Sequence, residues 1–151
     1  MVVRAARPAE AGALSELALA SKGHWGYDAA FLEACRGELT LTADDVVAER
    51  AAVVERDGRL VGFCTLVGEP PELELGMMFV DPAHVGGGVG RELWAHATAA
   101  ARRLGAERMT IDADPHAEAF YLAMGAVRVG EVASESIPGR VLPRLEYRPK
   151  G

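Results

Sequence analysis

The spacing of apolar residues along the chain predicts helices that alternate with strands. Apolar side chains recur every three or four positions after residue 88: Val89, Leu93, Ala97, Ala100 and Leu104. This spacing places them on one face of a long helix, which Gly105 is suited to end. Elsewhere, short apolar runs bounded by Gly, Pro or Asp are typical of strands.

Local signals indicate where most of the other elements begin. Asp28 is suited to cap one helix, and Thr42 with Asp45 resembles a capping box at the start of another. The pair Asp57-Gly58 predicts a hairpin turn between two apolar runs. The predicted strands are 2–5, 51–55, 59–67, 73–80, 108–112, 127–132 and 144–147, and the predicted helices start near 8, 28 and 42 and cover 88–104 and 117–124.

This order of elements predicts an α/β (α+β) fold. The strands of the first half form a mostly antiparallel meander, because short connections join them. The long helix 88–104 lies between two predicted strands and makes one β-α-β crossover in the second half. A loop over residues 68–71 is expected between the third and fourth strands.

The composition fits one domain over residues 1–151 and excludes several classes of function. Half of the chain is hydrophobic, and no Ser-, Pro- or Gly-rich linker divides it. The net charge is −6 without a basic stripe, which argues against nucleic acid as a partner. No apolar run approaches the length that spans a membrane, and Glu10 and Glu16 make the N-terminal stretch a poor signal peptide. Cys35 and Cys64 are expected to be buried thiols in a cytoplasmic protein, with a Cys35 that lines the substrate site as the alternative.

A glycine-rich turn joins the predicted strand 73–80 to the long helix. Four of its five residues are glycine: Gly86, Gly87, Gly88 and Gly90. Bare backbone N–H groups and the positive end of the helix dipole together suit a phosphate. A dinucleotide fingerprint needs another glycine spacing, and a P-loop needs Lys-Ser/Thr where Arg91-Glu92 stands. A turn that binds nothing is the alternative, although such a turn needs only one or two glycines.

The same segment resembles the central motif of the GNAT superfamily of acyl-CoA-dependent N-acetyltransferases. Val80-Asp81-Pro82 matches the end of its strand, and Gly88-x-Gly90 matches its glycine pair. Val85 departs from the motif, since Gln or Arg usually stands there. The resemblance covers nearly the whole chain and implies the GNAT fold, a mixed, mostly antiparallel sheet of six to seven strands flanked by helices, with a central β-α-β unit that binds acetyl-CoA.

The resemblance also implies which residues bind acetyl-CoA. The backbone of the glycine turn would hold the pyrophosphate: Val85, Gly86, Gly87, Gly88, Val89, Gly90 and Arg91. Backbone groups of Met78 and Val80 would pair with the pantetheine arm like an added strand. The amide near Phe79 would polarise the thioester carbonyl, and His116 stands where relatives often have an asparagine that contacts pantetheine. In the family, this strand splays from the next one and the cofactor lies between them.

Two residues are candidates for the proton transfers that acetylation of an amine requires. Tyr121 lies where many GNAT proteins place a tyrosine that faces the sulfur and protonates the leaving thiolate; the alternative is a core residue. Glu74 lies where several members carry a catalytic glutamate acting through water. Its alternative is a solvated charge at a strand edge, and Glu72 is expected on the same face. Some members use no side-chain base.

The acceptor site of this fold is built from the first two helices and the loop before the last strand. The polar and aromatic loop 21–27 offers His24, Trp25 and Tyr27 as one wall of a pocket. Arg140 is a candidate for the opposite wall, where it would bind a substrate carboxylate; the alternative is a pair with a surface acid.

The function implied by the resemblance is transfer of an acetyl group from acetyl-CoA to a primary amine of a small molecule. Direct attack within a ternary complex is expected, with no metal ion. A non-catalytic acyl-CoA sensor or scaffold of the same fold is the first alternative, and an enzyme that uses another nucleotide is the second. Homodimers are common in the family, and the acceptor amine stays open.

Overall fold

The computed structural model describes residues 1–149, so Lys150 and Gly151 of the predicted domain lie outside the described residues. Seven strands form one sheet in the order β1-β2-β3-β4-β5-β7-β6. They are β1 Val2–Ala5, β2 Ala52–Arg56, β3 Arg59–Glu69, β4 Glu72–Val80, β5 Arg108–Asp112, β6 Val127–Ala133 and β7 Val141–Tyr147. Neighbouring strands run antiparallel except β4 and β5, which are parallel. The predicted fold class is confirmed.

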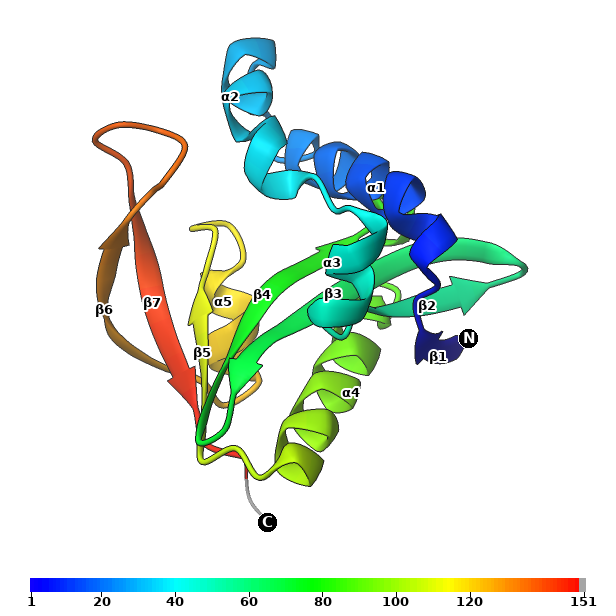
Figure 1. Cartoon of the computed structure of the whole chain (residues 1–151). Helices are drawn as coiled ribbons and strands as arrows, with labels where there is room; N and C mark the ends of the chain where they lie inside the picture. The colour runs from blue at the N-terminus through cyan, green and yellow to red at the C-terminus, as the bar shows by residue number, and fades with distance from the viewer. Residues whose placement is uncertain (150–151) are drawn as a thin grey trace.

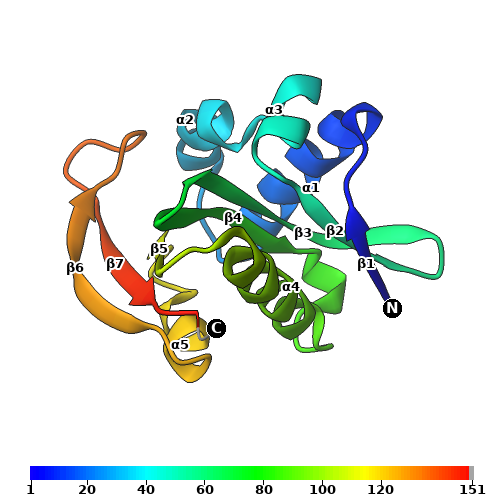
Figure 2. The same cartoon turned by 60° about the horizontal axis from the view of Figure 1, so that its bottom comes forward.

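The helices cover both faces of this sheet (Figures 1 and 2). They are α1 Ala11–Gly23, α2 Ala29–Leu39, α3 Ala43–Ala48, α4 Val89–Leu104 and α5 Glu118–Ala123, with short 3-10 helices at Pro8–Glu10 and Pro82–His84. Helices α1 to α3 share one core with Phe63, and α4 and α5 share the other with Leu73. No helix within residues 1–149 is long and apolar enough to cross a membrane.

The capping residues predicted from the sequence lie at the ends of the observed helices. The Asp28 carboxylate accepts from the amide of Phe31 at 2.8 Å. Thr42 and Asp45 each accept from the other's amide and form the predicted capping box. Gly105 ends α4 with φ +85°, a conformation that favours glycine. Short-range polar signals therefore located these helix ends correctly.

Three loops were predicted too long, because the helix or strands next to each continue into part of the expected loop. Strands β3 and β4 extend to Glu69 and Glu72, so the predicted loop 68–71 shrinks to a turn at Pro70-Pro71. Helix α1 continues to Gly23, where the sequence suggested a loop from residue 21. Strand β7 begins at Val141 and passes through Pro143. Proline has no N–H to donate within a sheet, but the carbonyl of Pro143 accepts a hydrogen bond from the amide of Ala113 at 3.0 Å.

A bulge in β4 and the divergence of β4 from β5 shape the region of the predicted site. Thr65 pairs with Met77 and Leu66 with Leu75, so Gly76 is the extra residue of the bulge. A Cβ on Gly76 would lie 2.9 Å from Thr65 Oγ1, which leaves room only for glycine. Strand β4 pairs with β5 only over Glu72–Glu74, and beyond that point the two strands separate as the resemblance implied.

Candidate active site

A cavity of about 700 Å³ occupies the space where β4 leaves β5. One end lies against the glycine turn, and the other lies against α1, α2 and the start of β7. Its volume falls in the range of small-molecule and cofactor sites. The cavity connects the predicted donor and acceptor regions in one continuous volume.

The glycine turn presents backbone N–H groups to one end of the cavity. Gly86 and Gly88 have φ of +86° and +88°, so side chains at either position would be strained. Gly88 is the N-cap of α4, and the first amides of this 16-residue helix have no intrahelical acceptor. A Cβ on Gly90 would lie 3.3 Å from the Phe120 ring. Of the seven predicted pyrophosphate residues, Val85, Gly86, Gly88, Gly90 and Arg91 line the cavity.

The other two residues of that set support the turn from behind. The Gly87 amide bonds the carbonyl of His84 at 3.1 Å, which closes the turn. The Val89 side chain is 1 % exposed and lies in the core under Gly62. His84, which the motif did not single out, also lines the cavity.

The outer part of β4 forms one long wall of the cavity. Met78, Phe79 and Val80 all line it, as the resemblance implied. These residues pair with β3 on one edge only, because β5 has already diverged. Their other backbone edge is therefore free to pair with an extended ligand, as an added strand would.

Tyr121 belongs to the core and also lines the cavity, a position compatible with both alternatives weighed from the sequence. Its side chain is 5 % exposed, and its ring lies 5.9 Å from Trp94 and 5.3 Å from Phe120 between centroids. Its hydroxyl makes no hydrogen bond with any described residue, and Tyr121 is among the residues that line the cavity. Burial raises the pKa of Tyr121 above its usual value. The phenol is therefore protonated at neutral pH and is suited to donate a proton.

Glu74 lines the cavity beside the bulge. Burial raises the pKa of its carboxyl, and so does the negative charge of Asp112, while Arg144 lowers it. Arg144 itself is paired with both oxygens of Asp112, at 2.8 and 3.1 Å. Because β4 is an interior strand, Glu74 is not a charge at a sheet edge. Glu72, by contrast, pairs with Arg108 at the surface at 2.8 Å.

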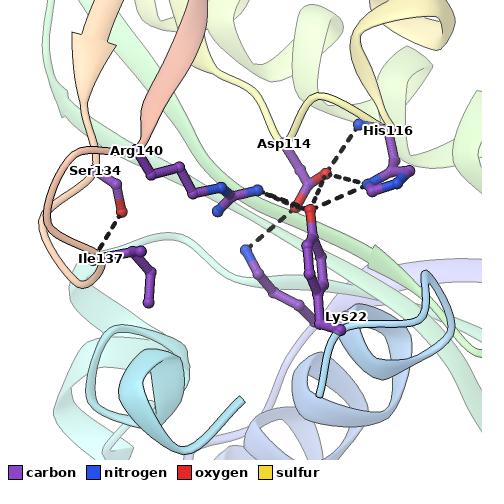
Figure 3. A network of polar contacts seen from close by, with 7 residues as sticks. Lys22, Asp114, His116, Ser134, Ile137 and Arg140 are labelled. Carbon is purple, nitrogen blue, oxygen red and sulfur yellow. Dashed lines mark hydrogen bonds and ion pairs between the residues drawn. The ribbon is translucent and has the colours of Figure 1, made fainter. Parts of the chain in front are cut away.

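A network of polar side chains centred on Asp114 joins three segments at the acceptor end (Figure 3). The Tyr27 hydroxyl lies 3.0 and 3.1 Å from the two carboxylate oxygens, and Arg140 reaches this hydroxyl at 2.7 Å and the carboxylate at 3.3 Å. His116 approaches Asp114 with its amide at 2.9 Å and its Nδ1 at 3.0 Å. Lys22 contributes an ion pair at 3.4 Å.

The charges of this network keep Asp114 ionised. Burial raises the pKa of Asp114. Hydrogen bonds from His116 and Tyr27 and the charge of Lys22 lower it by more, and the net pKa is about 2. Burial and the Asp114 charge raise the pKa of Tyr27 to about 12. Asp114 is therefore a fixed negative charge that holds together α1, the loop after it and the loop before β7.

The predicted acceptor residues fall into two groups. His24 and Trp25 line the cavity, and Trp25 stacks on His116 with centroids 5.1 Å apart. Tyr27 and Arg140 stand behind this lining, where Tyr27 stacks on Phe31 at 4.0 Å. Arg140 binds Asp114 inside the protein, so neither a surface acid nor an open pocket wall describes its place. His116, predicted beside pantetheine, lines the cavity and contacts Asp114 and Trp25.

Sequence reasoning missed Lys22 and Asp114 as residues of the site. Lys22 was read as part of a loop, yet it lies four and eight residues after Ala18 and Leu14. This spacing puts all three on one helical face, which is buried. Asp114 follows β5 directly, and no spacing in the sequence reveals that Arg140 and Tyr27 meet it.

The sequence profile of the Acetyltransferase (GNAT) family matches residues 18–126, and the chain belongs to this family of acyltransferases. Among curated protein sequences, none matches the chain significantly.

Solved structures share the fold over nearly the whole chain. A GCN5-related N-acetyltransferase from Rhodopseudomonas palustris is 24% identical with a TM-score of 0.80, covering 97% of this chain and 94% of its own. PaiA N-acetyltransferase from Thermoplasma acidophilum, solved with coenzyme A, is 16% identical with a TM-score of 0.80 and coverages of 97% and 98%. YncA from Salmonella typhimurium, solved with acetyl-CoA, is 21% identical with a TM-score of 0.70 and coverages of 100% and 95%.

Proposed function

We propose that this protein transfers the acetyl group of acetyl-CoA to a primary amine of a small molecule. The continuous cavity carries the proposal, because it joins an anion site at the glycine turn to Tyr121 and Glu74. The structures of PaiA with coenzyme A and of YncA with acetyl-CoA support the same donor on this fold.

The pyrophosphate of acetyl-CoA would lie on the amides at the start of α4, where the helix dipole stabilises negative charge. Pantetheine would extend along the free edge of β4 at Met78 and Val80. This path leads the thioester past Phe79 toward Tyr121 and the bulge. The backbone of β4 would then polarise the thioester carbonyl.

The amine nitrogen would attack the thioester carbon directly, forming the C–N bond as the C–S bond breaks. Glu74 would take the proton that the nitrogen loses, directly or through water, and Tyr121 would give a proton to the departing thiolate. The products are the N-acetylated amine and coenzyme A. A cysteine intermediate has no support, because Cys35 and Cys64 are buried outside this cavity and burial raises the pKa of Cys64 to about 12.

The network centred on Asp114 favours a small acceptor. It ties the end of α1 to the loop before β7 through the shared carboxylate of Asp114, which narrows the acceptor end. Two structural neighbours are ribosomal-protein alanine N-acetyltransferases, from Brucella melitensis and Escherichia coli, so peptide acceptors belong in the test.

Two measurements test the proposal together. Calorimetry measures acetyl-CoA binding, and a thiol-release assay measures turnover with small amines and with peptides that have a free N-terminus. We expect binding and turnover of a small amine. Binding without turnover of any amine favours the sensor, turnover of peptides alone contradicts the small acceptor, and tight ATP binding without coenzyme A binding favours the other nucleotide.

A further inference from the structure

Lys22 is a buried cation whose bonding capacity is largely unused. Its side chain is 10 % exposed, lies in the last turn of α1 and lines the acceptor end of the cavity. Its ammonium has one ionic partner, Asp114 at 3.4 Å, and makes no hydrogen bond with any described residue. The rings of Tyr27 and Phe31 lie 6.0 Å from the ammonium, at the outer limit of a cation–π contact, and carry no negative charge to pair with it. An ammonium has three N–H donors, so most of this donor capacity is left for a ligand in the cavity that Lys22 lines.

Asp114 is not an exclusive partner of Lys22, because the same carboxylate also pairs with Arg140. Its two oxygens already receive the Tyr27 hydroxyl and two contacts from His116. Arg140 approaches the same oxygen as Lys22 and is the closer of the two, at 3.3 Å (Figure 3). Two cations therefore share one anion, which leaves one positive charge of these three residues unmatched, and Lys22 is the cation of the pair that lines the cavity. A buried charge without matched acceptors is costly, so a negative ligand group would stabilise this site.

The two arginines that line the cavity differ from Lys22 in their charge partners or in their position. Arg144 is paired through two bonds with Asp112. Arg91 lies in the first turn of α4, next to the glycine turn, where the donor phosphates are expected. Among the described residues that line the cavity, Lys22 is thus the lysine or arginine whose carboxylate partner is shared with a second cation.

We infer that Lys22 binds a carboxylate of the acceptor, so that the substrate is a small amino acid carrying both the reacting amine and an anion. The inference rests on the proposed function and narrows its substrate class. Glu74, Glu38 and Glu135 also line the cavity and suit the ammonium end of such a substrate. A polyamine fits worse, because it leaves the Lys22 donors unused and brings a further positive charge next to them. Arg140, the candidate from the sequence, positions Asp114 behind Lys22 and does not line the cavity.

The test compares matched acceptors that differ only in the carboxylate. The twenty amino acids, their carboxamides, and a set of diamines and polyamines are assayed with acetyl-CoA by thiol release. We expect the best amino acid to exceed its carboxamide by at least about tenfold in kcat/KM, as a charge-assisted contact predicts. Lys22→Met should remove most of this preference, and Lys22→Gln, which keeps a polar side chain without charge, should do the same. Arg36→Met removes an exposed positive charge on α2 and should keep the preference.

Binding separates this inference from the proposed function. Calorimetry titrates the same amino acids into protein saturated with coenzyme A, so no turnover is needed. Amino acid binding that Lys22→Met weakens at least about tenfold supports the inference even if no amine is acetylated. A carboxamide or polyamine that matches or exceeds every amino acid overturns it. Turnover and binding that are equal in Lys22→Met and the parent overturn it as well.

Discussion

The donor and acceptor ends of the cavity are built in different ways. At the donor end, backbone amides at Gly88 and Gly90 and the free edge of β4 provide the polar groups. At the acceptor end, side chains provide them, and Asp114 gathers Lys22 and Arg140 from segments distant in the sequence. A backbone site tolerates changes of side chain if the turn is preserved, whereas a site of shared side-chain charges does not.

This contrast explains why one end identifies a family and the other leaves the substrate open. The turn still matches the motif although Val85 stands where Gln or Arg is usual, and backbone amides rather than this side chain are proposed to bind the pyrophosphate. The charges at the acceptor end can be rearranged without changing the fold. Substitutions at the two ends should therefore separate donor affinity from acceptor recognition, while changes at the chemical centre should affect turnover alone.

The largest effect is expected where the two ends meet, at Tyr121. Tyr121→Phe removes the hydroxyl and keeps the ring that packs on Trp94 and Phe120. We expect kcat to fall about 100-fold, because the thiolate leaves without its proton donor, with acetyl-CoA affinity changed by less than about twofold. Steady-state kinetics and calorimetry measure the two quantities. Unchanged turnover would leave Tyr121 as a core residue only.

A smaller loss is expected at Glu74. Glu74→Gln should lower kcat/KM about 30-fold by removing the proton acceptor. In the parent, kcat/KM should rise with pH through the pKa of Glu74, which lies above its usual value, and this rise should disappear in the variant. Glu72→Gln is the matched control, because Glu72 lies on the same strand but pairs with Arg108 at the surface. Equal losses in both variants would contradict a role for Glu74 as the base.

Glu74 also links the chemistry to stability. Its folded pKa is raised, so its contribution to stability is complete below the unfolded pKa and is lost as pH rises through the folded pKa. Above the folded pKa the parent therefore carries a desolvated charge that Glu74→Gln lacks. Thermal unfolding as a function of pH should show a Tm advantage of the variant that grows as pH rises through the folded pKa, and an advantage that shrinks would argue against the burial of this charge.

The sequence predicted the donor end better than the acceptor end for a physical reason. Glycines, caps and the strand end at Val80-Asp81-Pro82 act on their own neighbours, so their spacing carries the information. The pair of Arg140 with Asp114 depends on how the loop before β7 folds over β5, and no local pattern encodes it. The bulge at Gly76 was missed too, since an isolated glycine in a strand does not reveal the Thr65 side chain beneath it.

At the acceptor end, Asp114→Asn should raise the acceptor KM about tenfold, because Lys22 and Arg140 then repel each other without their shared anion. Acetyl-CoA affinity should change by less than about threefold, since the glycine turn is untouched. Kinetics with each substrate varied in turn measure both values. If acetyl-CoA affinity fell by a larger factor than the acceptor KM rose, the two ends of the cavity would not be distinct sites.

The same variant has a defined pH dependence of stability. The folded pKa of Asp114 is lowered from 3.8 to about 2, so the parent gains stability above the unfolded pKa and loses it as pH falls from 4 to 2. Asp114→Asn lacks this titration. The stability difference between the two proteins, measured by urea unfolding, should shrink by roughly 1–2 kcal/mol over that range. A constant difference would mean that Asp114 is not held as a buried anion.

The smallest effect is expected at the donor end, where a single methyl group tests the backbone site. Gly90→Ala places a Cβ 3.3 Å from the Phe120 ring, which must move by a few tenths of an ångström. We expect acetyl-CoA affinity to fall about threefold while acceptor KM stays within about twofold, because only the approach to the α4 amides changes. Calorimetry and kinetics distinguish the two.

Gly37→Ala is the control for that substitution, since Gly37 lies in α2 and a Cβ there meets nothing within 4 Å. It should leave acetyl-CoA affinity unchanged and stabilise the protein by about 0.5–1 kcal/mol, as alanine does inside a helix. If Gly90→Ala raised the acceptor KM by as large a factor as it lowered acetyl-CoA affinity, the two ends of the cavity would not be independent. A methyl group at the glycine turn would then affect the network centred on Asp114. Donor weakening alone would show that the backbone end works independently of the charges opposite it.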